Sequence, residues 1–271
     1  MSDFVVPIAG ILYLGGGLLH FFALVTERKE VERFALFSFV VGFFLHLGFL
    51  FFQYRESGVE SVRSIPFASV FVSCCLVALY LCIGKVRRQP SLGALIGLAA
   101  FAVSTVFWLK PTLGREIGSA WDSDLFPIHV TLTLMGYSFF ALAGCSALLY
   151  LLAERGIKQK WKWPLFFVLP SLESLDKLSI HAVTNGFALL TFGLATGVVL
   201  SRQEWGAYWY WDPKWVLSLL IWMVYALLIQ VRLFRGVRGR KLAYLCLVGF
   251  AAVLFTFAGL QLLFNTKHVF V

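Results

Sequence analysis

Charged residues are scarce in this chain of 271 residues. They make up 14% of the sequence, whereas hydrophobic residues make up 60%. A soluble domain of this size carries roughly a quarter charged residues, so the composition excludes an ordinary soluble domain. Alternation of apolar and polar residues with period two is also absent, which argues against a transmembrane β-barrel. We therefore expect an integral membrane protein built from helices.

The motifs of soluble enzymes are missing as well. The sequence contains no G-x-x-x-x-G-K-[ST], no G-x-S-x-G and no H-E-x-x-H, which are typical of nucleotide-binding, hydrolase and zinc sites. The N-terminus has no basic region, so we expect no cleavable signal peptide. The cysteines form no C-x-x-C pair and lie inside apolar runs, which is typical of small buried hydrophobic residues rather than disulfides. They are Cys74, Cys75, Cys82, Cys145 and Cys246.

The sequence instead contains long apolar runs. About 20 apolar residues are needed for a helix to cross the hydrocarbon of a membrane. The runs cover residues 4–25, 34–54, 66–84, 91–109, 127–153, 178–200, 214–232 and 242–264. We predict an all-α fold in which residues 1–271 form a single polytopic domain, an integral membrane bundle of about eight transmembrane helices.

The basic residues predict the orientation of this bundle. Of the 23 lysines and arginines, 16 fall in the segments that follow the first, third, fifth and seventh runs, if Arg232 at the very end of the seventh run is included. Basic residues collect on the cytoplasmic side, so both termini are expected outside the cytoplasm. The net charge of +9 is then explained by topology and by attraction to anionic lipids of the bilayer. No nucleic-acid partner is needed to explain it.

Tryptophan is concentrated in and directly after one predicted external loop, residues 201–214. Four of the nine tryptophans fall between Trp205 and Trp215, together with Asp212, Pro213 and Lys214. Flat apolar rings with a few polar groups suit a large planar ligand. The alternative is a belt of interfacial aromatic residues, but such belts scatter their aromatic residues over many helix ends.

Two histidines on the predicted outer side are candidate ligands for iron. His129 begins the fifth run and His268 follows the eighth. Two imidazoles on opposite faces of a planar macrocycle would form a bis-histidine haem site, with the Trp-rich loop as its wall. The alternative is that both side chains are simply solvated at the interface.

The other histidines lie within the runs. His20 and His181 fall at similar depth near the cytoplasmic ends of their runs, and Gln230 is at that level too. Ionisable groups inside spans are often functional, so these histidines are candidates for an inner site where a ligand enters. They are equally compatible with imidazoles that are hydrogen-bonded inside a bundle, and His46 is expected to be of that kind.

The Trp-rich loop resembles the motif that marks the cytochrome c assembly family. It reads Trp205-Gly206-x-Tyr208-Trp209-x-Trp211-Asp212-Pro213-Lys214. Further similarity lies in Gly186-Phe187, Leu190-Thr191, Gly193, Arg238-Gly239-Arg240 and Gly249-Phe250. The resemblance covers most of the C-terminal half and is weak in the first four runs. The tyrosine and the Asp-Pro-Lys sequence favour the CcsA/ResC branch.

This resemblance implies a function in cytochrome c biogenesis: haem b is carried across the membrane and presented outside to apocytochrome c, whose cysteines form thioether bonds with it. It implies a CcsB/ResB-type partner, a thiol-reducing pathway, one role in a cytochrome c synthase (haem lyase) complex, and a place in the bacterial inner membrane with the haem site on the periplasmic side. The implied axial ligands are His129 and His268. The implied haem-facing loop residues are Trp205, Gly206, Tyr208, Trp209, Trp211, Asp212 and Lys214.

The sequence departs from the family pattern at two positions. Trp215 stands where the family usually has Glu, and Gln230 stands where it usually has a histidine. Because glutamine is a poor iron ligand, either the inner haem site is lost or His20 or His181 supplies the ligand. Two alternatives stay open: a HemX-like membrane protein that is tied to haem synthesis, and a transporter of another hydrophobic substrate.

Overall fold

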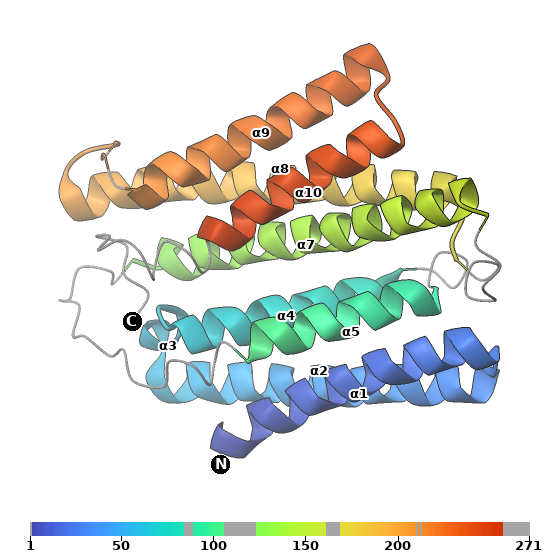
Figure 1. Cartoon of the computed structure of the whole chain (residues 1–271). Coiled ribbons are helices and arrows are strands. Elements are labelled where there is room, and N and C mark those ends of the chain that lie inside the picture. The colour runs from blue at the N-terminus through green and yellow to red at the C-terminus, as the bar shows by residue number, and fades with distance from the viewer. Residues whose placement is uncertain are drawn as a thin grey trace.

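The computed structural model describes residues 2–83, 89–105, 123–160, 169–209, 211 and 213–256. The regular structure in these ranges is entirely helical (Figure 1). The helices are α1 (Ser2–Thr26), α2 (Lys29–Ser57), α3 (Val59–Val62), α4 (Ile65–Cys82), α5 (Pro90–Ser104), α7 (Leu125–Lys158), α8 (Leu172–Trp205), α9 (Pro213–Arg235) and α10 (Arg240–Leu254).

A helix lies in each of the eight apolar runs, and α3 is an additional single turn. Five helices, α1, α2, α7, α8 and α9, are long and apolar enough to cross a membrane, and α4 and α5 are shorter apolar helices. The all-α prediction is confirmed for the described residues, and the chain is a multi-pass helical membrane protein.

Helices α2, α7 and α8 extend further into polar segments than their apolar runs predict. Helix α8 begins before residue 178 because the Ser171 hydroxyl accepts a hydrogen bond from the Ser174 N–H at 3.2 Å, which caps its first turn. It ends at Trp205 because Gly206 adopts a left-handed conformation with φ +74°. The predicted loop 201–214 is therefore wrong in its bounds: residues 206–212 connect α8 to α9, and Trp205 belongs to the helix.

Consecutive long helices run antiparallel in two groups (Figure 1). Helices α1, α2, α4 and α5 form one group, α7 to α10 form the other, and α7 joins them through contacts with α4 and α5. Helix α7 is the centre of the bundle. In its most apolar stretch 72% of the residues are buried inside the protein, whereas the corresponding share for α9 is 17%.

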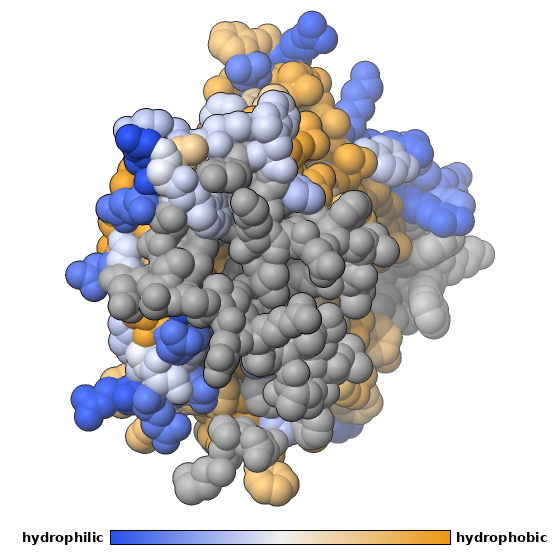
Figure 2. All heavy atoms as spheres, turned by 90° about the vertical axis from the view of Figure 1, so that its left-hand side faces the viewer, coloured by the Kyte–Doolittle hydropathy of each residue, from blue (hydrophilic) through white to orange (hydrophobic). Residues whose placement is uncertain are grey.

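The bundle has two chemically different ends. We call the end where α8 meets α9 and where α7 begins the aromatic end, and the opposite end, with the α9–α10 turn, the basic end. Viewed from the aromatic end, described hydrophilic residues gather around the rim and hydrophobic residues line the flanks (Figure 2). This distribution is what a membrane-spanning bundle requires, because its flanks face lipid and its ends face water.

Glycines bring α7 and α8 together in the part of their contact that lies toward the aromatic end. A Cβ atom at Gly136 would lie 3.1 Å from the Gly186 carbonyl oxygen, and one at Gly193 would lie 2.6 Å from the Thr133 hydroxyl. Small residues allow membrane helices to approach closely. The family-like residues Gly186 and Gly193 thus have a structural role: they set the distance between the two helices that carry the candidate site.

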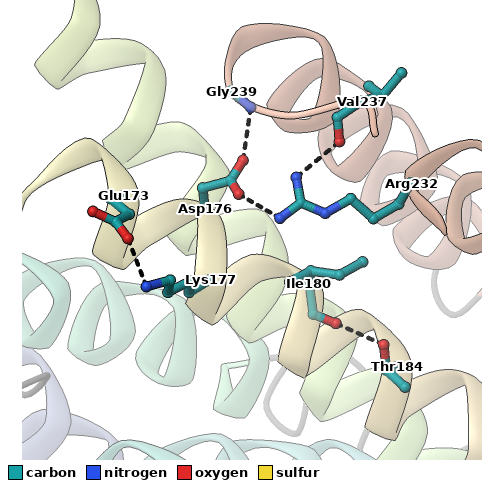
Figure 3. A network of polar contacts seen from close by, with 8 residues as sticks. All are labelled: Glu173, Asp176, Lys177, Ile180, Thr184, Arg232, Val237 and Gly239. Atoms are coloured by element: carbon teal, nitrogen blue, oxygen red, sulfur yellow. Dashed lines mark hydrogen bonds and ion pairs between the residues drawn. The ribbon is translucent and has the colours of Figure 1, made fainter. Parts of the chain in front are cut away.

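A polar cluster fastens the basic end (Figure 3). Asp176, in the first turns of α8, forms an ion pair of 2.8 Å with Arg232 of α9 and accepts a hydrogen bond of 2.7 Å from the Gly239 N–H. Arg232 also donates to the Val237 carbonyl. Gly239 has φ +67°, and a Cβ atom there would lie 2.8 Å from the Tyr150 hydroxyl. This explains the glycine in the family-like Arg-Gly-Arg sequence.

Candidate functional site at the aromatic end

The last turn of α8 holds the start of the Trp-rich loop. The Ser201 hydroxyl donates to the Ala207 carbonyl at 2.8 Å, and Arg202 donates to the Gly206 carbonyl. The Arg202 guanidinium also lies over the Tyr208 ring, 5.3 Å from its centroid, which is within the range of a cation–π contact. The first half of the loop is therefore anchored to a rigid helix.

Three indoles follow one another from the interior to the surface. Trp215 is buried, Trp209 lies 5.5 Å from it between ring centroids, and Trp211 lies a further 5.5 Å from Trp209 at an interplanar angle of 85°. Trp211 is 85% exposed and Trp209 is 37% exposed. Exposed indole faces of this kind offer a flat apolar surface to a ligand.

His129, in the first turns of α7, is oriented by α8. Its Nδ1 lies 2.8 Å from the Gly193 carbonyl oxygen. A carbonyl only accepts, so Nδ1 carries a proton, and in the neutral imidazole Nε2 then carries the lone pair. The ring is half-buried and packs on Gly197, where a Cβ atom would lie 2.9 Å from the ring. A backbone carbonyl that fixes the tautomer in this way is the usual support of a metal-ligating histidine.

The imidazole and the indoles lie at the same end of the bundle. The Ser123 hydroxyl, just before α7, donates to the Gln203 side chain near the end of α8 at 3.1 Å. Helix α8 rises about 12 Å from Gly197 to Trp205, at about 1.5 Å a residue. His129 therefore lies roughly two helical turns below the loop.

Three predicted site residues fall wholly or partly outside the part of the chain that the structure describes. His268 and Asp212 lie outside the described residues, as do the side-chain positions of Lys214. The pairing of His129 with His268 on one iron thus stays a prediction. The structure describes the other predicted loop residues at the aromatic end: Gly206, Tyr208, Trp209 and Trp211 follow α8, and Trp205 packs against the core.

The structure does not bring His20 and His181 together. His20 is fully buried in the first group of helices, 3.4 Å from the Tyr80 hydroxyl and 5.2 Å from Phe39 between ring centroids. His181 is exposed on α8, which packs against α7, α9 and α10. Gln230 is exposed on α9. A shared inner site of the two histidines is not formed, and His20 has the surroundings of a hydrogen-bonded imidazole inside the bundle.

Sequence reasoning missed the residues that support the site. The Gly193 carbonyl accepts from His129 and also from the Thr196 hydroxyl at 2.8 Å. The Trp222 indole N–H donates to the Thr191 hydroxyl at 2.9 Å and holds α9 on α8. The spacing of Gly186, Gly193 and Gly197 on one face of α8 was the available signal.

The fold and the site together define a polytopic helical membrane protein that carries an exposed indole surface and an oriented imidazole at one end. The sequence model of the family described as "Cytochrome C assembly protein" matches residues 62–268. The chain belongs to this family.

Similar relatives are cytochrome c biogenesis proteins named CcsA. That of Chlamydomonas reinhardtii is 28% identical over 262 residues, covering 93% of this chain and 72% of the relative. That of Heterosigma akashiwo is 25% identical over 293 residues, covering 92% and 89%. That of Synechococcus sp. (strain CC9902) is 31% identical over 189 residues, covering 62% and 61%.

Proposed function

We propose that this protein acts in cytochrome c biogenesis by holding haem b at the aromatic end and presenting it to apocytochrome c. The proposal assigns one axial position on the iron to His129 and the other to His268. The exposed faces of Trp209 and Trp211 form the wall of the site. Haem is the cargo, and it supplies the vinyl groups with which the client's cysteines form thioether bonds.

The orientation of His129 is the observation that carries the proposal. Because Nδ1 donates to the Gly193 carbonyl at 2.8 Å, the lone pair on Nε2 is the one that an iron would bind. The side chain is half-buried at the same end as the exposed indoles. An oriented imidazole below a flat aromatic surface at the same end of the bundle fits a planar macrocycle with a metal at its centre.

The proposal includes a topology and a location. The eight helices cross the bacterial inner membrane with both termini outside, since 16 of the 23 basic residues fall on the opposite side. The aromatic end then faces the periplasm. A CcsB/ResB-type partner completes a cytochrome c synthase, and a thiol-reducing pathway keeps the client's cysteines as nucleophiles. This chain contributes position, whereas the client contributes the thiolates.

The residues at the basic end favour a second candidate function. Gln230 occupies the position of the family's inner histidine, and His20 and His181 lie in different groups of helices, so the two form no shared site. This arrangement supports entry of haem from lipid or from the partner rather than through an inner bis-histidine site. It also favours a HemX-like protein, which is tied to haem synthesis and transfers no haem outward.

Absorption spectroscopy of the purified full chain with haem tests the proposal. We expect a Soret band in the wild type, a partial loss of haem in His129→Ala and His268→Ala, and loss of most haem in the double variant. His181→Ala is the matched control, because His181 is an exposed histidine on α8 outside the site. Unchanged haem content in the double variant would reject the ligands, and a wild type without a Soret band would favour the HemX-like or transporter alternatives.

A further inference from the structure

The outward faces of the helices differ in chemistry. Every exposed residue of α1 between residues 4 and 25, and of α2 between 34 and 52, is Phe, Leu, Ile or Val. Examples are Ile11, Leu18, Phe22, Phe37, Phe44 and Phe51. Such faces suit contact with lipid tails, which make no hydrogen bonds.

The outward face of α8 is different in its basic half. The exposed residues at the start of its apolar run are His181, Thr184, Asn185 and Ala188, which we call the polar stripe. Their spacing places them on one helix face, turned away from the glycine contact with α7. None of the four is a large apolar residue.

The polar stripe begins near the end of the apolar run of α8, at His181, and extends into it as far as Ala188. Asn185 is nine residues beyond Asp176 of the basic-end cluster, which is about 13 Å along the helix at 1.5 Å a residue. Its amide donates to the His181 carbonyl at 2.8 Å, a bond that leaves its side-chain oxygen available as an acceptor. On the neighbouring α9, the exposed Gln230 lies two residues from Arg232, which pairs with Asp176.

Lipid offers no partner to these groups, and polar side chains that face it are costly. Helix–helix contacts in membranes use hydrogen bonds from Asn, Gln, Thr and His, together with small residues that permit close approach. We infer that the polar stripe of α8 is the docking face for a transmembrane helix of a second protein, which hydrogen-bonds to Asn185 and His181 and passes over Ala188.

The charges at the ends of this face favour a different protein over a second copy. The exposed face of α8 carries Lys177 toward the basic end and Arg202 at the aromatic end. A two-fold axis along the membrane normal would oppose identical residues, so arginine would meet arginine, and Lys177, although paired with Glu173, would meet lysine. A partner helix with an acidic residue beside Arg202 avoids this repulsion.

This docking face rests on the proposed function only for the expectation that a membrane partner exists. It does not depend on haem binding. Photo-cross-linking of the full chain in its native membrane tests it, with p-benzoylphenylalanine at Ala188 and, as the matched control, at the lipid-facing Leu18. We expect position 188 to give an adduct that maps to a membrane-spanning segment of another protein, and position 18 to give none.

Two changes beside the probe make the result specific. Asn185→Leu is expected to lower the adduct about fivefold, as loss of one interhelical hydrogen bond in a membrane would, whereas Asn185→Gln keeps most of it. An adduct with a second copy, lipid adducts alone, equal adducts at positions 188 and 18, or an adduct unaffected by Asn185→Leu would each overturn the inference.

The haem spectrum of the same preparations separates the two proposals. Asn185→Leu is expected to leave it unchanged, which also shows that the variant is folded. If the wild-type chain binds no haem but position 188 still cross-links to another protein, the docking face is supported and the haem site is rejected.

Discussion

At the scale of single residues, the close contact between Gly197 and His129 gives a direct test of the oriented imidazole. A Cβ atom at Gly197 would lie 2.9 Å from the ring, too close for both to keep their places. We expect Gly197→Ala to tilt the imidazole and weaken haem binding about tenfold, in line with the usual 1–3 kcal/mol of overpacking. Haem titration followed by absorbance measures this.

The matched controls are Gly15→Ala and Gly48→Ala, since a Cβ atom at either position meets no neighbour within 4 Å. They are expected to bind haem like the wild type. If Gly197→Ala binds haem as tightly as these controls, His129 does not act as a ligand in the orientation described.

The histidines show how far residue-level prediction reaches. The sequence predicts the depth of a side chain, because depth follows from its place in an apolar run. In the structure the Trp-rich loop and His129 belong to the same end of the bundle. The sequence does not predict lateral position. His20 and His181 share a depth but lie in different groups of helices, because neighbours in the membrane plane are set by packing between distant helices.

At the scale of elements, the contact between α7 and α8 rests on glycines and is open to mutation. A Cβ atom at Gly186 would lie 2.8 Å from the Phe140 ring and 3.1 Å from the Gly136 carbonyl oxygen, and the backbone cannot move aside. We expect Gly186→Val to lower the free energy of unfolding by about 1–3 kcal/mol, measured as a lower melting temperature in detergent.

Gly48→Val is the control for this change, because it adds the same bulk where nothing lies within 4 Å. Equal melting temperatures for the two variants would show that α7 and α8 do not approach as closely as the structure has them.

The helices themselves are the most predictable part of the fold. A helix lies in each apolar run, and five of the described helices are long and apolar enough to cross a membrane, because length and apolar character are properties that a sequence shows directly. The ends of the helices were less predictable, since they depend on local hydrogen bonds: the Ser171 cap starts α8 early, and the left-handed Gly206 stops it only after Trp205. The α8–α9 connection is therefore shorter than its composition suggests.

At the scale of the whole molecule, the ion pair between Asp176 and Arg232 and the turn at Gly239 belong to one end, and the indoles belong to the other. The structure thus fixes which groups share an end. The side of the membrane that each end faces is predicted from the distribution of basic residues alone. The orientation of the bundle therefore has to be measured separately.

Cysteine labelling measures this orientation. Tyr208→Cys and Arg238→Cys place thiols on exposed positions at the aromatic and basic ends, in a Cys82→Ser background that removes an exposed native thiol. Because 16 of 23 basic residues lie on one side, a membrane-impermeant maleimide is expected to label position 208 in intact spheroplasts and position 238 only after permeabilisation. Labelling of both after permeabilisation confirms that both thiols are reactive. The reverse pattern would turn the indoles toward the cytoplasm, where apocytochrome c is not matured, and would rule out presentation of haem to it while leaving the helix bundle as described.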